Sequence, residues 1–206
     1  MSDFIQLVKE RRSAMNFLPN QPIHPEELNE MFELVKLAPS AFNLQHTNYI
    51  AVTDPTTKDQ LKEAAYGQYK VSSASAVILV LGDKKAYEQA AEIYSGLQLL
   101  GILNKQEYDF MVNDTVTFYE SRGSEFQREE AIRNASLSAM LFMLIAKEKG
   151  WDTCPMIGFD PEKVKQILNI DDQHEVVMMM TIGKEKISSR QPRGYRKPVS
   201  EFVQFI

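Results

Sequence analysis

The stretch Ala38-Pro39-Ser40-Ala41-Phe42-Asn43-Leu44-Gln45-His46 lies between an amphipathic helical pattern and an apolar strand pattern. Its small polar side chains, Ser40, Asn43 and Gln45, stand between apolar residues. Such a loop can hold a flat heteroaromatic ligand by its polar edge while proline and phenylalanine pack nearby. The alternative is a plain turn, because asparagine and serine also favour turns. The stretch therefore predicts a ligand-binding loop or an ordinary connection between a helix and a strand.

Composition is typical of a soluble globular protein. The chain has 206 residues, enough for one large or two small domains, and 44% of them are hydrophobic and 25% charged. The net charge of −5 argues against broad nucleic-acid binding, which needs a basic face. The N-terminus is polar and no apolar run approaches a membrane span. We therefore expect a cytoplasmic protein without a signal peptide, a membrane partner or a nucleic-acid partner.

Cysteine and histidine usage predicts no metal site. Cys154 is the single cysteine, which excludes an intramolecular disulfide, and metal-type spacings are absent. His24, His46 and His174 are scattered, without an H-E-x-x-H arrangement. We expect a structural or channel-lining role for His46 and a small core position for Cys154.

Hydrophobic periodicity predicts alternating helices and strands. Helices are expected at residues 3–11, 25–35, 57–66, 84–100, 105–121, 129–149 and 161–168. Buried strands are expected at residues 49–53, 76–81 and 175–182. Some segments between strands are long and heavily helical, which favours an α+β sheet wrapped by helices over a doubly wound sheet. A G-x-G-x-x-G motif is missing after the first strand, so a Rossmann site is not expected.

Two apolar segments are candidates for an interface between chains. The helix predicted at 129–149 is apolar on more than one face, which implies burial on several sides. The segment 199–206 contains Phe202, Val203, Phe205 and Ile206. Both segments can instead belong to the core of a single chain.

Basic residues gather toward both ends of this acidic chain. Residues 184–197 carry six Lys or Arg against one acid, Glu185, and Arg11 and Arg12 add two more positive charges. Arginine forms bidentate bonds to phosphate, and Ser13 can add a third contact. The alternative is a solvated basic tail and a helix end that carries favourable cations.

Five short motifs follow one another in the chain. They are Arg-Arg-Ser at 11–13, Ala-Pro-Ser-Ala-Phe-Asn-Leu-Gln at 38–45, Gly-Gln-Tyr-Lys at 67–70, Pro-Met-Ile-Gly-Phe at 155–159 and Arg-x-x-Arg-Lys-Pro at 193–198. From about Phe4 to Val203 this series resembles the FMN-dependent nitroreductase family. The resemblance implies one domain over residues 1–206 with a nitroreductase-like α+β fold. A central mixed, mostly antiparallel β-sheet would be surrounded by helices, with a helical insertion at about 84–122.

The resemblance also implies an interlocked homodimer with two FMN sites at the subunit interface and the tail 199–206 extended onto the partner. Contacts to the FMN phosphate and the ring edge are expected from Arg11, Arg12 and Ser13, and further contacts to the phosphate are expected from Arg193 and Arg196. The partner subunit is expected to supply Pro39, Ser40, Ala41 and Asn43. Gln68 and Lys70 are expected to reach the ribityl chain or the pyrimidine end of the ring. The segment expected to lie against the isoalloxazine consists of Pro155, Met156, Ile157 and Gly158.

Two positions depart from the family pattern. Met15 stands where many members carry a basic residue, which shifts the expected positive charge near the flavin O2 to Lys70. Ile157 stands where some members place an acid, which makes the ring surroundings more apolar and leaves the choice of NADH or NADPH open.

The activity implied by the resemblance is ping-pong hydride transfer at flavin N5, from NADH or NADPH to a flat nitroaromatic or quinone acceptor. Such chemistry needs no side-chain nucleophile or metal. Two alternatives remain at this point: a flavin-binding protein with little or no turnover, and an interaction protein that has lost the flavin site. The aromatic residues Phe110, Phe118 and Tyr119 are expected in the core rather than along a substrate channel, and Met178 to Met180 are also expected in the core.

Overall fold

A four-stranded antiparallel sheet with the strand order β1-β2-β4-β3 forms the centre of the fold. The structure is a computed structural model, and it describes residues 4–206; Asp3, the first residue of the predicted N-terminal helix, lies outside them. The strands are β1 (Thr47–Val52), β2 (Ala76–Asp83), β3 (Asp152–Met156) and β4 (His174–Gly183). The expected α+β fold with a mostly antiparallel sheet is confirmed. All pairs among these four strands are antiparallel, and a single bridge between Ser13 and Thr153 adds a parallel pairing at the β3 edge.

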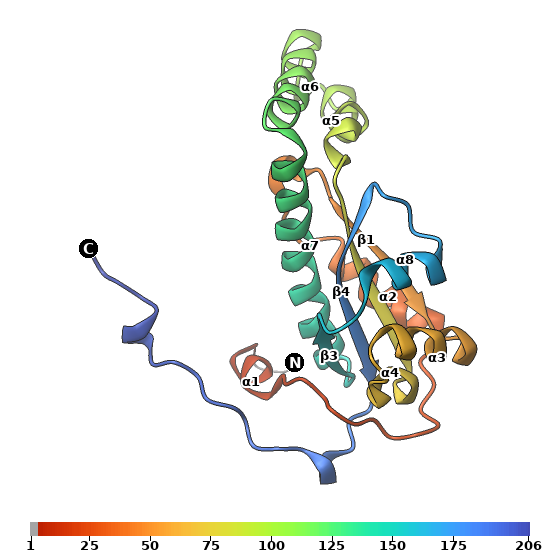
Figure 1. Ribbon diagram of the computed structural model, residues 1–206. Coiled ribbons are helices and arrows are strands. Elements are labelled where there is room, and N and C mark those ends of the chain that lie inside the picture. Colours follow the sequence, from red (N-terminus) through yellow and green to blue (C-terminus); the bar gives the residue numbers. More distant parts are fainter. Residues whose placement is uncertain (1–3) are drawn as a thin grey trace.

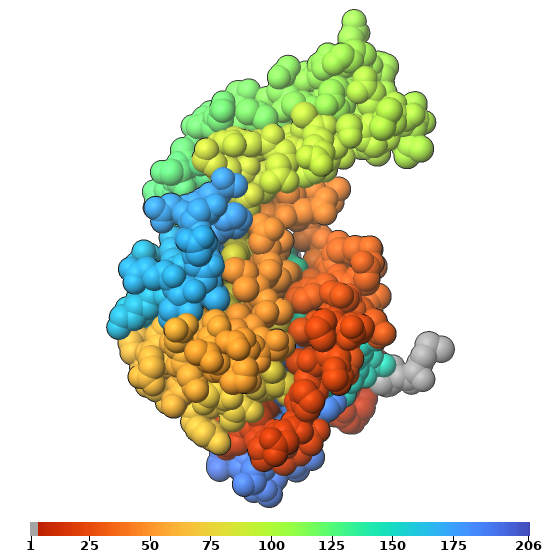
Figure 2. Space-filling model, turned by 90° about the vertical axis from the view of Figure 1, so that its right-hand side faces the viewer, coloured from red at the N-terminus to blue at the C-terminus, as the bar shows by residue number. Residues whose placement is uncertain are grey.

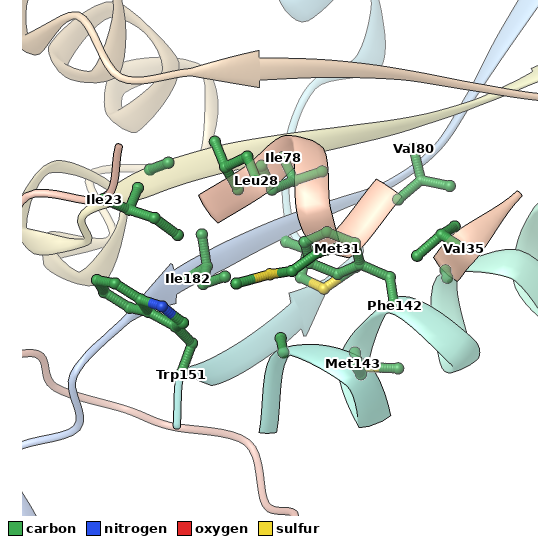
Figure 3. Close-up of a cluster of buried hydrophobic side chains, with 14 of the residues drawn as sticks. Ile23, Leu28, Met31, Val35, Ile78, Val80, Phe142, Met143, Trp151 and Ile182 are labelled. Carbon is green, nitrogen blue, oxygen red and sulfur yellow. The ribbon is translucent and has the colours of Figure 1, made fainter. Parts of the chain in front are cut away.

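Alternating side chains of β2 supply the hydrophobic cores on the two faces of the sheet, because successive residues of a strand point to opposite faces. Ile78 and Val80 belong to the core beneath α2 (Pro25–Val35) and α7 (Gly123–Glu148), which Figure 3 shows. Val77 and Leu79 belong to the core beneath α3 (Pro55–Ala64) and α8 (Pro161–Leu168). Every residue of β2 is buried.

The remaining helices lie around this layered centre (Figure 1). They are α1 (Phe4–Glu10), α4 (Tyr69–Ser73), α5 (Ala90–Leu99) and α6 (Lys105–Glu120), with short 3-10 helices η1 (Ala41–Asn43), η2 (Ala86–Gln89), η3 (Ile187–Ser189) and η4 (Val199–Glu201). The helices α5 and α6 form an arm that projects past the sheet, as Figures 1 and 2 show. This arm corresponds to the predicted helical insertion.

Local chemistry sets several helix ends. The side chains of Asp54, Asn104 and Asp160 accept bonds from backbone N–H groups in the first turns of α3, α6 and α8. Gly150 follows α7 with φ +77°, the left-handed conformation that favours glycine and ends a helix.

Two predictions about the elements are wrong. The strand β3 was not expected, because Pro155 lies within it and the segment is short. The strand at the edge of the sheet, β1, was expected to be buried, but only Val52 of it is fully buried. Within the single chain, the helix α7 is buried on one side, and its opposite side leaves Leu137 48% and Met140 41% exposed.

The C-terminal tail, residues 190–206, lies on the outside of the molecule. All of its residues are exposed, including Phe202, Phe205 and Ile206. Figure 1 shows it running away from the sheet and ending far from the rest of the chain. Among the described residues, no helix combines the length and the hydropathy that a membrane span requires.

Candidate functional site

Arginines from both ends of the chain meet in one small cavity, which we call the arginine cavity. It has a volume of about 180 Å³, and its lining includes Arg11, Arg12, Ser13, Arg193 and Arg196. The Arg193 guanidinium donates to the backbone carbonyl oxygens of Lys9, at 2.5 Å, and Arg11, at 3.3 Å. Arg12 donates to the carbonyl oxygen of Gln191. The structure thus brings together the two basic segments that the sequence places almost a full chain apart.

Positive charge in the arginine cavity is not fully compensated. Burial lowers the pKa of Arg11, and repulsion by Arg193 and Arg196 lowers it further. The carboxylate that also lines the cavity, Glu185, is already bonded to Arg190. A cluster of guanidinium groups that repel one another is a favourable site for a multiply charged anion such as a phosphate.

The strand β3 leads from the arginine cavity to the predicted residues Gln68, Lys70 and Gly158. Ala14 N–H donates to the Thr153 carbonyl oxygen at 3.0 Å, which fixes the chain after Ser13 along β3. Beside Thr153, the Cys154 sulfur accepts from Lys70 Nζ at 3.4 Å. Beyond the end of β3, Gln68 Nε2 donates to the Gly158 carbonyl oxygen at 2.8 Å.

The predicted segment Pro155–Gly158 therefore begins in β3 and continues past its end, and its residues present different groups. Ile157 is 85% exposed and directs an apolar side chain to the surface. Met156 is 6% exposed and packs in the core under α3 and α8, so only its backbone is available to a ligand. Gly158 lies so close to Gln68 that a Cβ there would meet Gln68 Nε2 at 3.3 Å.

The loop Ala38–His46 does not line the arginine cavity. Its residues Pro39 and Ser40 line a separate cavity of about 370 Å³ between α2 and β1. The loop is bonded to Asn134 in the middle of α7, whereas Figure 1 places α1 beside the C-terminal end of that helix. Within one chain, Pro39, Ser40, Ala41 and Asn43 are thus separated from the other predicted site residues.

The loop has an unusual backbone that sequence reasoning missed. Phe42, Asn43 and Gln45 have φ values of +54°, +56° and +52°, a region that residues other than glycine rarely adopt. Asn134 and Tyr94 hold it from α7 and α5, and neither was predicted as a site residue. The available signal was a polar residue, Asn134, within the apolar pattern of 129–149.

Most of the other residues singled out in the sequence are buried as expected. His46 is 1% exposed, and burial lowers its pKa to about 4 although Asp83 acts in the opposite direction. Cys154 is 3% exposed, and Tyr119 is 1% exposed. The core position expected for Phe110 is wrong, because its side chain is 70% exposed on the arm.

Comparisons with known proteins identify the family and the fold. Residues 8–184 match the model of the Nitroreductase family. The chain is 73% identical over 206 residues to MhqN of Bacillus subtilis (strain 168), provisionally named as an NAD(P)H nitroreductase, with full coverage of both chains. A crystal structure of the Bacillus subtilis protein ydfN, also provisionally named as a nitroreductase, has a TM-score of 0.97 at 72% identity and covers 98% of each chain. A protein from Exiguobacterium sibiricum, provisionally assigned as a nitroreductase and crystallised in complex with FMN, has a TM-score of 0.91 at 28% identity; the match covers all of this chain and 98% of that one.

Proposed function

The chain belongs to the nitroreductase family of oxidoreductases, and from that premise we propose that it uses FMN and NAD(P)H to reduce nitroaromatic or quinone-type acceptors. The observation that carries the proposal is the arginine cavity, where Arg193 and Arg196 repel the Arg11 guanidinium. A phosphate there would relieve this repulsion. The proposal places the enzyme in the cytoplasm, where both nicotinamide co-substrates are available.

The residues of this chain fit FMN as two groups. Arg11, Arg12, Ser13, Arg193 and Arg196 would hold the phosphate. Gln68, Lys70 and the segment Pro155–Gly158 would hold the rest of the ligand along the continuation of β3. Bound FMN would supply the hydride chemistry between the nicotinamide and the acceptor. Lys70 would place a positive charge beside the ring, which favours its anionic reduced form.

The size of the arginine cavity supports a site shared by two chains. A volume of about 180 Å³ suits a phosphate, whereas sites for cofactors usually enclose about 300–1,000 Å³. The missing walls would come from the partner subunit's loop, with Pro39, Ser40, Ala41 and Asn43. We propose a twofold homodimer because one such interface completes both sites at once.

Three exposed features of the single chain support this dimer. The outer face of α7 presents Leu137 and Met140, and the tail presents Phe202 and Phe205. The strand β1 pairs only with β2 among the described residues, so its other edge carries free backbone groups. We propose that the tail 199–206 crosses to the partner subunit and lies along that edge.

A visible spectrum followed by an anaerobic titration tests the activity. Purified protein, or apoprotein given FMN, should be yellow, should bleach with NADH or NADPH, and should regain colour with a quinone or a nitroaromatic compound. A yellow protein that does not bleach would support the alternative, a flavin-binding protein without turnover. A protein that stays colourless with excess FMN would refute flavin binding.

Deletion of residues 199–206 tests the dimer. The truncated chain should be monomeric by light scattering and should lose FMN. A matched control, Phe110→Ser, removes an exposed aromatic side chain from the arm instead of the tail and should stay dimeric. A truncated chain that remains a flavin-loaded dimer would contradict the proposed role of the tail.

A further inference from the structure

The loop Ser40–Gln45 adopts a conformation that its own residues do not favour. Phe42, Asn43 and Gln45 are all left-handed, and each pays a steric penalty that glycine would avoid. Such a backbone persists only where its surroundings fix it, and these segments concentrate at ligand sites. The bonds that fix this loop therefore identify residues on which its shape depends.

One of these bonds comes from α7. Asn134 is 3% exposed, and its side-chain oxygen accepts from Ala41 N–H at 2.8 Å. The orientation of the amide is determined, because its nitrogen donates to the Glu130 carbonyl oxygen at 2.7 Å and a carbonyl oxygen can only accept. Asn134 therefore presents a fixed acceptor to the start of the left-handed segment.

The other bond comes from the arm. Tyr94 is 4% exposed, and its hydroxyl donates to the Phe42 carbonyl oxygen at 3.0 Å. The same hydroxyl lies 3.2 Å from Thr115 Oγ1 on α6, which can donate to it. The Phe42 ring packs against Phe118 at 5.1 Å between ring centroids. The loop is thus held between α7 on one side and the arm on the other.

We infer that Asn134 and Tyr94 are positioning residues that fix the loop Ser40–Gln45 in the shape that contacts the partner subunit's FMN. The inference rests on the proposed function, since it concerns the loop that would close that site. Neither residue touches the flavin in this scheme. Each acts through a backbone group of the loop, Asn134 through Ala41 N–H and Tyr94 through the Phe42 carbonyl.

Two variants with matched controls test the inference. Tyr94→Phe removes only the hydroxyl, and its control is Tyr108→Phe, which removes an equivalent bond within the arm, from Tyr108 to the Ala91 carbonyl oxygen at 2.9 Å. Asn134→Ala removes the acceptor, and its control is Ser136→Ala, which removes a bond from the same helix to the Ile132 carbonyl oxygen at 2.7 Å.

Two measurements are made on each protein: the Kd of the apoprotein for FMN, by flavin fluorescence, and hydrogen exchange of the loop amides in the apoprotein. Each test variant should raise the Kd by about 3- to 10-fold, the effect of one hydrogen bond. Each should also speed exchange in residues 41–45. The controls should leave both quantities unchanged.

The outcomes separate this inference from the proposed function. Test variants that match their controls in both measurements would overturn it, as would a lowered melting temperature with an unchanged Kd. If the wild-type chain failed to bind FMN, the proposed function and the role of the loop in flavin binding would both fall. Hydrogen exchange of the loop amides in the apoprotein would still decide whether Asn134 and Tyr94 hold the loop in its conformation.

Discussion

Replacement of Arg196 by glutamine should weaken FMN binding strongly without destabilising the protein. Within residues 4–206 this guanidinium donates only to the nearby carbonyl oxygens of Gly194 and Tyr195, so its loss breaks no hydrogen bond between distant segments of that part of the chain. It lines the arginine cavity and contributes to the repulsion that lowers the pKa of Arg11. The variant therefore removes a proposed phosphate ligand and, at the same time, a source of repulsion in the apoprotein.

The size of the effect follows from the kind of bond that is lost. A hydrogen bond to a charged group contributes about 1.5–3 kcal/mol. At about 1.4 kcal/mol for each factor of ten, the Kd for FMN should rise by about 10- to 150-fold. The unfolding midpoint of the apoprotein should stay the same or rise slightly, because Arg11 is no longer repelled by the Arg196 guanidinium.

The assay is a fluorescence titration of apoprotein with FMN at two salt concentrations, beside urea unfolding of the apoprotein. Lys197→Gln is the control, since Lys197 is exposed in the same tail and does not line the cavity. It should change the Kd by less than about twofold, as surface charges contribute little. An equal Kd for Arg196→Gln and the wild type would show that the phosphate does not bind in the arginine cavity.

Two further predictions concern stability. Gly82→Ala should destabilise the fold by about 1–3 kcal/mol in urea unfolding, because the new Cβ would lie 2.8 Å from the Ala131 carbonyl oxygen of α7; Gly96→Ala, with no atom near its Cβ, should be neutral or stabilising. Burial lowers the pKa of His46 from 6.5 to about 4, so the unfolded chain takes up this proton first as the pH falls. The free energy of unfolding is therefore not reduced by this group above about pH 6.5. It falls as the pH drops toward 4, by up to about 3 kcal/mol. His46→Gln should reduce the pH dependence of the unfolding free energy in that window, and an unchanged slope would contradict the assignment.

Much of the fold could be predicted because local rules and burial agree there. The run Ala76–Leu81 is apolar at every position, and Pro161 with Asp160 before it sets the start of α8. The strand β3 could not be predicted, since Pro155 disfavours a strand and the pairing with β4 that outweighs it is a long-range contact. The same holds for the outer face of α7, where an apolar pattern does not say whether the covering surface belongs to the same chain.

The candidate site could also be predicted only in part from the sequence. Side chains that belong to short motifs could be singled out from the sequence, as were the arginines at positions 11, 12, 193 and 196. Their meeting in one cavity depends on bonds between the chain ends, such as Arg193 to the Lys9 carbonyl oxygen, which no local pattern encodes. Asn134 and Tyr94 escaped prediction because they act on backbone groups of a loop that is distant in the sequence.

The division of the proposed site between two chains makes a prediction that no single-chain site would share. One protomer carries Arg193→Gln and Arg196→Gln, and the other carries Ser40→Ala and Asn43→Gly, a change that keeps the left-handed backbone without steric cost. Neither homodimer should retain FMN, because every site has one defective half. A mixed dimer places both defects in one site and leaves the other site intact. If the protomers pair at random, about a quarter of all sites should regain FMN, since half of the dimers are mixed and half of their sites are intact.

The measurement is the flavin content of the co-expressed pair after gel filtration, against each variant alone. A mixture that holds no more flavin than the two separate variants would mean that the loop and the arginines act within one chain, and the shared site would have to be abandoned.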